Sequence, residues 1–513
     1  MTTTTSPTSE NPPLSKETQA VVWISILFIG LGLAVFLYLL TWVSANPDFS
    51  LAWETRDMSR ITLIFLTEFG IIRPVLLFLT GVYVIRMGIQ LFQREKMASL
   101  SAQQLLMWLG IASVFGLLLS IRNSGQMAGG ILIAIIPWAF LITIIVFTRR
   151  WLQSKEDLFI GQETLTARNG RMAWNLLIPT IAVLIIVALQ PLEQTFISSL
   201  TNDEFATNID VEFIGFDNYS RLLGLRFDTV PCERAGGSCV KDEDGNNVFP
   251  RSRRYLMDSI ENYAEWDYRP LNEITLGGTQ YVISARDRDF MNAIKDTLVF
   301  TVSSVVLELI LGLFIAMVVN SKFPGRGLMR TAMLVPWAIP TVVSARLWEL
   351  MLADRQSGVI NSILINLGII ERSQAWLTSA KLQVPAMVMV DVWKTTPFMA
   401  LLLLAGLQVI PKDVYEAADV DGASKVRQFF SITIPLLRPA IAVALVFRTL
   451  DAIRVFDLFQ VLLGGNRFSL ATYNYEMLVT NNDLGYASAV GVTIFVIILL
   501  FTMAYVRVLG VER

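Results

Sequence analysis

Long apolar runs separated by short polar segments dominate the sequence. Each run extends over about 20 residues, the length that a helix needs to cross about 30 Å of hydrocarbon. We predict about ten membrane-spanning helices, four in an N-terminal group and six in a second group that a long polar stretch interrupts. The predicted spans are Val21–Val43, Ile71–Phe92, Gln104–Ile121, Gly130–Thr148, Trp174–Gln190, Ala293–Val319, Leu328–Leu350, Val384–Leu407, Leu437–Leu462 and Ala489–Arg507.

The same pattern divides the chain into segments of different character. The first residues are rich in Thr, Ser and Pro and contain too little apolar surface to fold, which predicts a disordered tail. The fold class that follows is an all-α polytopic membrane protein with one insert on the outer side. The predicted segments are a tail at 1–20, a four-span region at 21–150, a first core span at 174–192, an extracytoplasmic insert at 193–289, and a transmembrane core at 290–510 that contains a loop at 411–435.

The distribution of basic residues predicts which ends of the spans face the cytoplasm. The segment 149–171 carries Arg149, Arg150, Lys155, Arg168 and Arg171, whereas the short loops assigned to the outside contain fewer cations. Cytoplasmic loops carry an excess of Lys and Arg. We therefore expect both termini in the cytoplasm and a bacterial-type inner (cytoplasmic) membrane as the location.

Composition narrows the functional classes. The chain is 54% hydrophobic and only 16% charged, with a net charge of -2 and no histidine. The net charge gives no reason to expect a nucleic-acid partner. Without histidine, the chain lacks the most common metal ligand and the side chain that most often transfers protons at neutral pH. No Gly-x4-Gly-Lys-Ser/Thr loop is present, so the chain has no P-loop for ATP. We expect no cofactor and no metal, and any ATP to be handled by a partner.

The polar stretch between the two groups of spans contains both cysteines of the chain, Cys232 and Cys239. Two cysteines in one outside segment are typical of a disulfide formed in an oxidising compartment. The alternative is two free surface thiols. Three aromatic residues, Trp266, Tyr268 and Tyr281, indicate a small folded insert rather than a linker.

A short polar island between two strongly apolar segments is the most specific pattern in the sequence. It reads Glu-Ala-Ala-Asp-Val-Asp-Gly from Glu416 to Gly422. Pro411 suits the first turn of a helix and Gly422 suits a sharp break, which predicts helix, turn, helix. We expect the second helix over Ala423–Ile432, with Pro435 ending or kinking it.

This island resembles the EAA loop of ATP-binding-cassette (ABC) importer permeases. In that family the loop docks into a cleft of a cytoplasmic ATPase subunit, with its glutamate as the chief polar contact. The alternative is an ordinary helical hairpin without a partner. By resemblance, the ATPase-coupling residues are Glu416, Ala417, Ala418, Asp421, Gly422 and Pro435.

The resemblance extends over most of the chain after Trp174 and points to carbohydrate permeases. It is carried by Phe213–Tyr219, Phe290–Thr297, Ala405–Gln408 and Gly485–Ala487. The larger permease subunit of maltose-type systems is the most similar. This chain differs from it in two ways: it has four spans before the six-span core, which is more than expected, and its insert is shorter. The resemblance implies a second, shorter permease, a dimer of ATPase subunits, an extracytoplasmic binding protein and a sugar such as maltose, maltodextrin or trehalose.

Charges within the predicted spans indicate a substrate path. Ionised groups at the centre of a span are costly and require a cavity or a partner. Aromatic faces can stack on sugar rings, while carboxylates and hydroxyls hydrogen-bond to sugar hydroxyls. The alternative is a structural ion-pair network, and Glu308 is expected to make hydrogen bonds between helices. In maltose-type permeases the central sugar site is built from the same two spans, which this arrangement resembles. The predicted path residues are Asp391, Trp393, Thr395, Phe398, Phe447, Asp451 and Arg454.

Two other functions stay open at this point. Arg448 and Arg454 suit phosphate, which keeps a permease for glycerol phosphate or polyols as an alternative. An ion-coupled secondary transporter also has charges within its spans, but it normally shows repeated halves, and we detect none here. A membrane enzyme needs convergent catalytic groups near one interface, and the sequence shows none.

Overall fold

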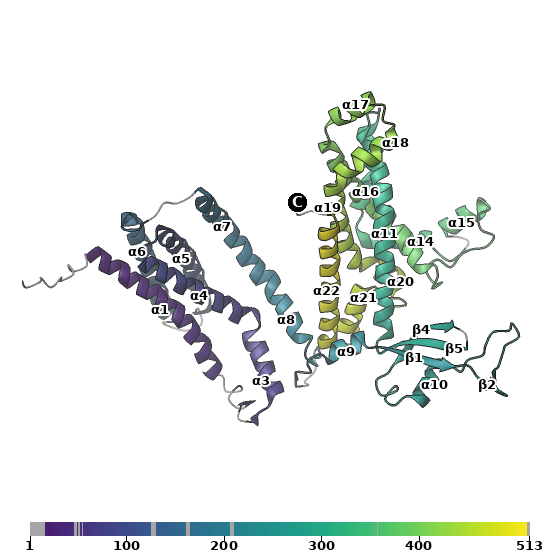
Figure 1. Cartoon of the computed structure of the whole chain (residues 1–513), viewed down its shortest axis with the longest axis horizontal. Coiled ribbons are helices and arrows are strands. Elements are labelled where there is room, and N and C mark those ends of the chain that lie inside the picture. Colours follow the sequence, from purple (N-terminus) through teal and green to yellow (C-terminus); the bar gives the residue numbers. More distant parts are fainter. Residues whose placement is uncertain are drawn as a thin grey trace, which may run out of the picture. The chain divides into compact units, whose positions relative to one another are not determined.

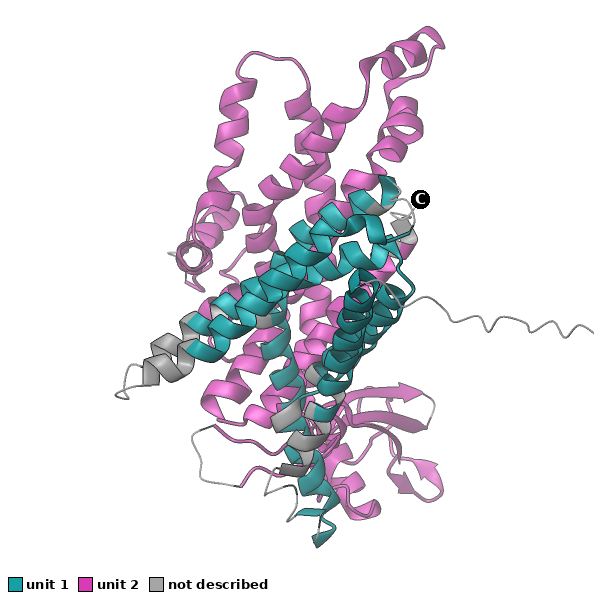
Figure 2. Cartoon of the chain, turned by 90° about the vertical axis from the view of Figure 1, so that its left-hand side faces the viewer, with its two compact units in different colours: residues 1–197 teal, residues 198–513 magenta. Residues whose placement is uncertain are grey.

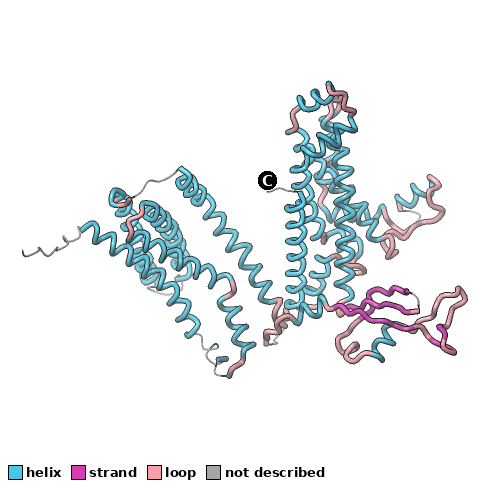
Figure 3. The backbone as a smooth tube through the Cα atoms, viewed as in Figure 1, coloured by secondary structure: helices cyan, strands magenta, loops and turns pink. Residues whose placement is uncertain are grey.

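The structure is a computed structural model of the chain. It describes residues 16–45, 49, 52–53, 55–124, 130–160, 165–205, 210–276, 278–355 and 358–509, so most of the predicted tail at 1–20 lies outside the described residues. The chain divides into two compact units, residues 1–197 and 198–513 (Figure 2). Helices make up most of both units, and the main strands gather in one place (Figure 3).

The first unit is built from long apolar helices. Among them α1, α4, α5 and α6 share one core, to which α1 contributes Phe28 and α4 contributes Leu91. The elements of the unit are α1 (Lys16–Ala45), α3 (Met58–Ile64), η1 (Phe65–Phe69), α4 (Ile72–Phe92), α5 (Lys96–Ser124), α6 (Gly130–Ser154), η2 (Glu156–Leu158), α7 (Leu165–Leu184), η3 (Ile185–Leu189) and α8 (Gln190–Ser198).

Helices α1 and α4 approach closely because small residues face each other where they cross. A Cβ placed on Gly88 of α4 would lie 3.0 Å from the carbonyl oxygen of Ser25 and 2.7 Å from Cγ1 of Ile29, both in α1. Small residues let the backbones of membrane helices approach, and van der Waals packing then holds the helices together. Gly30 of α1 has no atom within 4 Å of such a Cβ, so it points away from this contact.

We expect the substitution Gly88→Ala to destabilise the protein by about 1–3 kcal/mol, because the added methyl group forces α1 and α4 apart. Gly30→Ala is the matched control, since it adds the same methyl group in open space and should be neutral or slightly stabilising. Thermal unfolding of the two purified variants in detergent, followed by tryptophan fluorescence, measures the difference. Equal melting temperatures for both variants would contradict the close packing at Gly88.

The second unit begins with a small folded insert. Strands β1, β5 and β4 form an antiparallel sheet in that order, and α10 packs on one face of it through Leu256, which lies in a core with Val230 and Val282. The predicted disulfide is confirmed, since Cys232 and Cys239 are bonded. The insert contains α9 (Asp217–Leu223), β1 (Leu225–Pro231), β2 (Arg234–Ala235), β3 (Ser238–Cys239), α10 (Ser252–Ser259), β4 (Arg269–Leu276) and β5 (Thr279–Ala285).

The rest of the second unit is a helical core (Figure 1). Helix α11 packs against α16 and α19, and α19 packs against α22. Phe300 of α11 meets Phe459 of α20 edge to face at 5.6 Å. The core helices are α11 (Arg288–Asn320), α12 (Arg326–Met333), α13 (Val335–Ala338), α14 (Thr341–Met351), α15 (Val359–Asn366), α16 (Gln383–Val409), α17 (Lys412–Val420), α18 (Lys425–Gln428), η4 (Phe429–Thr433), α19 (Ile434–Ile453), α20 (Asp457–Leu463), α21 (Leu470–Tyr475), η5 (Glu476–Thr480) and α22 (Leu484–Leu509).

The helix count agrees with the predicted fold class. Among the described residues, eight helices are long and apolar enough to cross a membrane, and a bent pair of helices is a ninth candidate. Helix α6, of 25 residues, corresponds to the fourth predicted span. The insert adds a three-stranded β-sheet that the predicted all-α membrane fold did not include.

Three predicted elements differ from the structure, and prolines account for two of the differences. The predicted span Leu328–Leu350 is broken by an 89° bend at Pro340, because a proline disfavours helical backbone in the residue before it, here Ile339. The predicted second helix of the loop, Ala423–Ile432, begins at Lys425 and does not end at Pro435, which lies in the first turn of α19. That position needs no backbone N–H donor.

The third difference concerns the predicted span Leu437–Leu462. Helix α19 ends at Ile453, and α20 starts at Asp457 after a short break. Arg454 is the residue that caps α19. The break places polar side chains at the end of a membrane helix, where a cavity opens.

Candidate functional site

The predicted coupling loop, 411–435, contains α17, α18 and the turn between them. Gly422 has φ of +72°, so it supplies the left-handed backbone that the break requires. Glu416, Ala417 and Asp421 are exposed, whereas Ala418 is buried. The exposed face of α17 therefore carries a carboxylate next to an alanine, which leaves room for another protein surface to approach.

Polar contacts hold this loop in shape. Asp419 accepts hydrogen bonds from Lys425 at 2.7 Å and from the buried Gln428 at 2.5 Å. Tyr415 and Thr433 share a hydrogen bond of 2.9 Å, which ties α17 to the start of α19. The hydrogen bond from Lys425 lowers the pKa of Asp419. This contact therefore stabilises the loop above the ordinary pKa of an aspartate and is lost as the pH falls through the lowered value.

A buried cluster of charges joins three membrane helices at a second place. Arg448 of α19 donates from Nε to Glu308 Oε2 of α11 at 2.5 Å and from Nη2 to Glu308 Oε1 at 3.0 Å. Nη2 also donates to Asp391 of α16, and Nη1 donates to Asp451 at 3.0 Å. Thr395 donates to Glu308 at 2.5 Å. Four of the five N–H donors of the guanidinium are thus engaged by carboxylates.

A small polar cavity of about 170 Å³ opens beside this cluster. Lys394 donates to the carbonyl oxygen of Ile339 at 2.6 Å, and Arg454 donates to that of Leu450 at 3.0 Å. Asp451 has a side chain that is 71% exposed, so its carboxylate is open to a ligand. The charged and hydroxyl side chains that line the cavity are Thr341, Asp391, Lys394, Thr395, Arg448, Asp451, Arg454 and Asp457.

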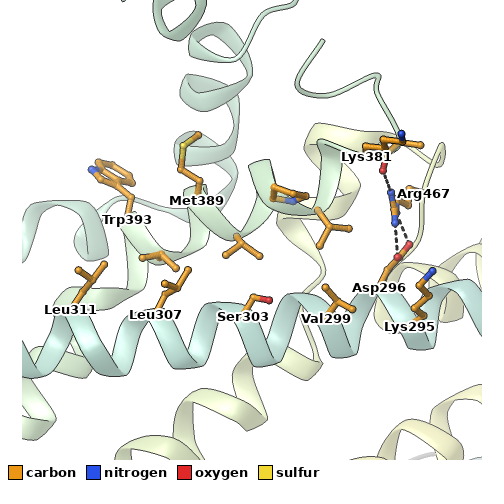
Figure 4. Close-up of a pocket in the computed structure, with 15 residues that line it drawn as sticks. Lys295, Asp296, Val299, Ser303, Leu307, Leu311, Lys381, Met389, Trp393 and Arg467 are labelled. Atoms are coloured by element: carbon orange, nitrogen blue, oxygen red, sulfur yellow. Dashed lines mark hydrogen bonds and ion pairs between the residues drawn. The ribbon is translucent and has the colours of Figure 1, made fainter. Parts of the chain in front are cut away.

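A larger and mainly apolar groove of about 840 Å³ runs between α11 and α16 (Figure 4). Leu307, Leu311 and Trp393 lie toward one end. At the other end Arg467 donates to both carboxylate oxygens of Asp296 at 2.5 Å. The groove offers contact area for hydrocarbon or for another helix, and few groups for a sugar hydroxyl.

The structure brings some of the predicted path residues together and separates others. Asp391, Thr395, Asp451 and Arg454 line the polar cavity, whereas Trp393 lines the apolar groove. Phe398 stacks on Trp337 with 5.7 Å between ring centroids, and Phe447 is 57% exposed. Neither aromatic ring lines the polar cavity.

Sequence reasoning left Glu308 and Arg448 out of the path, although they form the centre of the cluster. The prediction that Glu308 makes hydrogen bonds between helices is confirmed. A signal for the pair exists in the sequence, because each is an ionised group within a long apolar run and therefore requires a partner. The sequence does not indicate that they are each other's partner.

A second polar junction joins the insert to the helical core. Asp287 accepts hydrogen bonds from the hydroxyl groups of Tyr473 and Tyr486 and also caps α11 by accepting from the backbone of Phe290 at 2.8 Å. Burial, and then the charge of Asp287, raise the pKa of Tyr473, so its hydroxyl stays protonated as a donor. Strand β5 ends at Ala285 and α11 begins at Arg288, so the junction leaves little free chain.

A multi-pass helical core, a buried polar cavity between its spans and an exposed loop between two spans define a membrane permease. A family model described as "Binding-protein-dependent transport system inner membrane component" matches residues 308–510. The chain is 48% identical over 233 residues to the trehalose/maltose transport system permease protein MalF of Thermococcus litoralis, covering 44% of this chain and 76% of that protein.

Two further relatives have the same kind of name. The trehalose transport system permease protein SugA of Mycobacterium tuberculosis is 39% identical over 226 residues, covering 44% of this chain and 71% of the relative. The sulfoquinovosyl glycerol transport system permease protein SmoG of Agrobacterium fabrum is 37% identical over 238 residues, covering 46% and 76%. The chain belongs to the inner-membrane components of binding-protein-dependent transport systems, as a sugar permease subunit of an ABC importer.

Proposed function

We propose that this subunit carries an oligosaccharide inward by alternating access, with one ring of a trehalose- or maltose-like sugar bound at the polar cavity beside Arg448. The observation that carries the proposal is the cavity itself, which places ionised and hydroxyl groups between membrane helices. Ionisable residues inside a membrane bundle mark substrate pathways. The names of two relatives, which include trehalose, support this class of sugar.

The chemistry of the cavity suits sugar hydroxyls. A hydroxyl group both donates and accepts hydrogen bonds. The open carboxylate of Asp451 accepts from a hydroxyl, whereas Lys394 and Arg454 donate to one. Phe456, which is half-buried, also lines the cavity and offers apolar area for the C–H face of a ring. A transporter must bind its substrate with different affinity in its outward-facing and inward-facing states. A ligand that binds both states equally does not shift the equilibrium between them.

An anionic substrate is the second candidate. The relative named for sulfoquinovosyl glycerol favours it, as do the cationic groups of Arg448 and Arg454. The geometry argues against it, because the guanidinium of Arg448 is 2% exposed and is already engaged by Glu308, Asp391 and Asp451. Arg448 is therefore not free to bind phosphate, and the exposed Arg454 is the lining arginine left to an anionic substrate.

Coupling to ATP falls to partner subunits in this proposal. The exposed Glu416 on α17 is the contact that docks on a cytoplasmic ATPase, and the turn at Gly422 gives the loop its shape. A second permease subunit completes the transmembrane pathway in this proposal. The insert is a docking surface for an extracytoplasmic binding protein.

Transport in proteoliposomes tests the proposal. The complex is reconstituted with its ATPase and binding protein, and uptake of labelled trehalose, maltose and glycerol 3-phosphate is measured with ATP on the ATPase side. We expect ATP-dependent uptake of a sugar, and about a tenfold reduction in Asp451→Asn, which loses a charged hydrogen-bond acceptor. Asp157→Asn in η2 changes an exposed aspartate outside the proposed sites, so it is the control and should transport normally. Uptake of glycerol 3-phosphate alone, or uptake driven by an ion gradient without ATP, would overturn the proposal.

A further inference from the structure

Glu308 occupies an unusual place in the charge cluster. It is fully buried in α11, and it is absent from the lining of the polar cavity, whereas its partner Arg448 does line the cavity. Two hydrogen bonds join the two side chains, from Nε and Nη2 of Arg448 to the two carboxylate oxygens of Glu308. The carboxylate therefore holds the guanidinium from behind, on the side away from a ligand.

Bidentate geometry makes this contact strong and directional. An arginine and a carboxylate that share two parallel N–H···O bonds fix each other's orientation as well as their charge. The hydroxyl of Thr395 adds a third hydrogen bond to Glu308, at 2.5 Å, and so orients the carboxylate. Arg448 consequently presents the cavity with a guanidinium whose charge is balanced and whose engaged donors are directed toward α11, α16 and Asp451 of its own helix.

The balance of charge around the cavity depends on this one carboxylate. The lining contains the cations Lys394, Arg448 and Arg454 and the carboxylates Asp391, Asp451 and Asp457. These lining charges cancel, so Glu308 leaves the described site with an excess of negative charge. By formal charge, removing the charge of Glu308 makes the site neutral and weakens the hold on Arg448, which leaves the guanidinium free to turn toward the ligand.

We propose that Glu308 sets the charge selectivity of the sugar cavity, as a positioning residue that holds Arg448 away from the ligand and so excludes anionic sugars in favour of neutral ones. The inference rests on the proposed function, because it assigns the substrate class of the same cavity. It predicts a gain of binding in a variant, which is a result that simple damage to the fold does not produce.

The test compares a neutral sugar with its anionic analogue. The purified complex of this chain with its partner subunits is titrated with trehalose and with trehalose 6-phosphate, and both affinities are measured by saturation-transfer NMR. In the wild type, trehalose binds more tightly. In Glu308→Gln we expect the affinity for trehalose 6-phosphate to rise about tenfold relative to trehalose, because a charge-assisted hydrogen bond to phosphate becomes available.

A conservative variant separates charge from packing. Glu308→Asp disturbs the packing of α11 but retains the carboxylate, so its affinity ratio should stay close to that of the wild type. An equal shift of the ratio in both variants, or an unchanged ratio in Glu308→Gln, would overturn the assignment of selectivity to this charge. In Glu308→Gln, Arg448 keeps its contacts with Asp391 and Asp451, which favours a folded variant.

Failure of the proposed function gives a different result in the same titration. A wild-type complex that binds neither trehalose nor maltose contradicts the sugar cavity itself, and the inference falls with it. A wild-type complex that binds trehalose 6-phosphate more tightly than trehalose leaves a sugar cavity but contradicts the role of Glu308.

Discussion

Replacing Glu416 with lysine is expected to reduce substrate-stimulated ATP hydrolysis by the assembled transporter by about thirtyfold or more. Glu416 is exposed on α17, beside the buried Ala418 and ahead of the turn at Gly422, so the substitution leaves the fold of the loop unchanged. A reversed charge at the centre of an interface removes a favourable contact and adds a repulsive one, which is the behaviour of an energetic hot spot. The measurement is phosphate release by the reconstituted complex with and without sugar-loaded binding protein.

Glu371→Lys is a suitable control for this substitution. It makes the same change of charge at an exposed position in the loop between α15 and α16. We expect this variant to hydrolyse ATP like the wild type. Normal stimulated hydrolysis in Glu416→Lys would show that α17 is not the coupling contact. Co-purification of the ATPase with each variant then separates loss of assembly from loss of coupling.

The second large effect is expected at Arg448. The substitution Arg448→Met leaves Glu308 and Asp391 buried without their cation, and breaking a buried ion pair in this way costs about 3–5 kcal/mol. We expect a lower yield of folded protein and a markedly lower melting temperature in detergent. Uptake should be lost with the fold, whatever the sugar.

Two further variants define the origin of this effect. Arg454→Met removes an exposed guanidinium whose Nε donates to a backbone carbonyl within α19, and it should melt close to the wild type. The triple variant Glu308→Gln, Asp391→Asn, Arg448→Met removes the network as a whole and should recover much of the stability, because no unpaired charge remains. A stable Arg448→Met protein would contradict the buried network.

The sequence was sufficient to predict the features that depend on local pattern. Apolar runs long enough to span hydrocarbon predicted the helices, and Gly422 marked a turn that the structure confirms with a positive φ. The pairing of Cys232 with Cys239 followed from their isolation in one polar segment, and the structure confirms it. These predictions required only length, composition or the conformational preference of one residue.

Features that depend on packing could not be predicted in the same way. Trp393 and Asp391 lie two residues apart on α16, so they point to different sides of the helix and line different cavities. The contact of Arg448 with Glu308 joins residues 140 positions apart. The β-sheet of the insert was missed although the Gly-Gly pair at 277–278 is a hairpin signal between β4 and β5. The pairing of β1 with β5 joins strands far apart in the sequence and has no such local signal.

The junction at Asp287 has a mechanical consequence. Two tyrosine hydroxyls donate to Asp287 at the start of α11, and only two residues separate the end of β5 from that helix. Because so few residues link the sheet to the helix, we expect a displacement of the sheet to move α11 with it. The same helix carries Glu308 further along its length. A force on the insert would then reach the charge cluster around Arg448 through one helix.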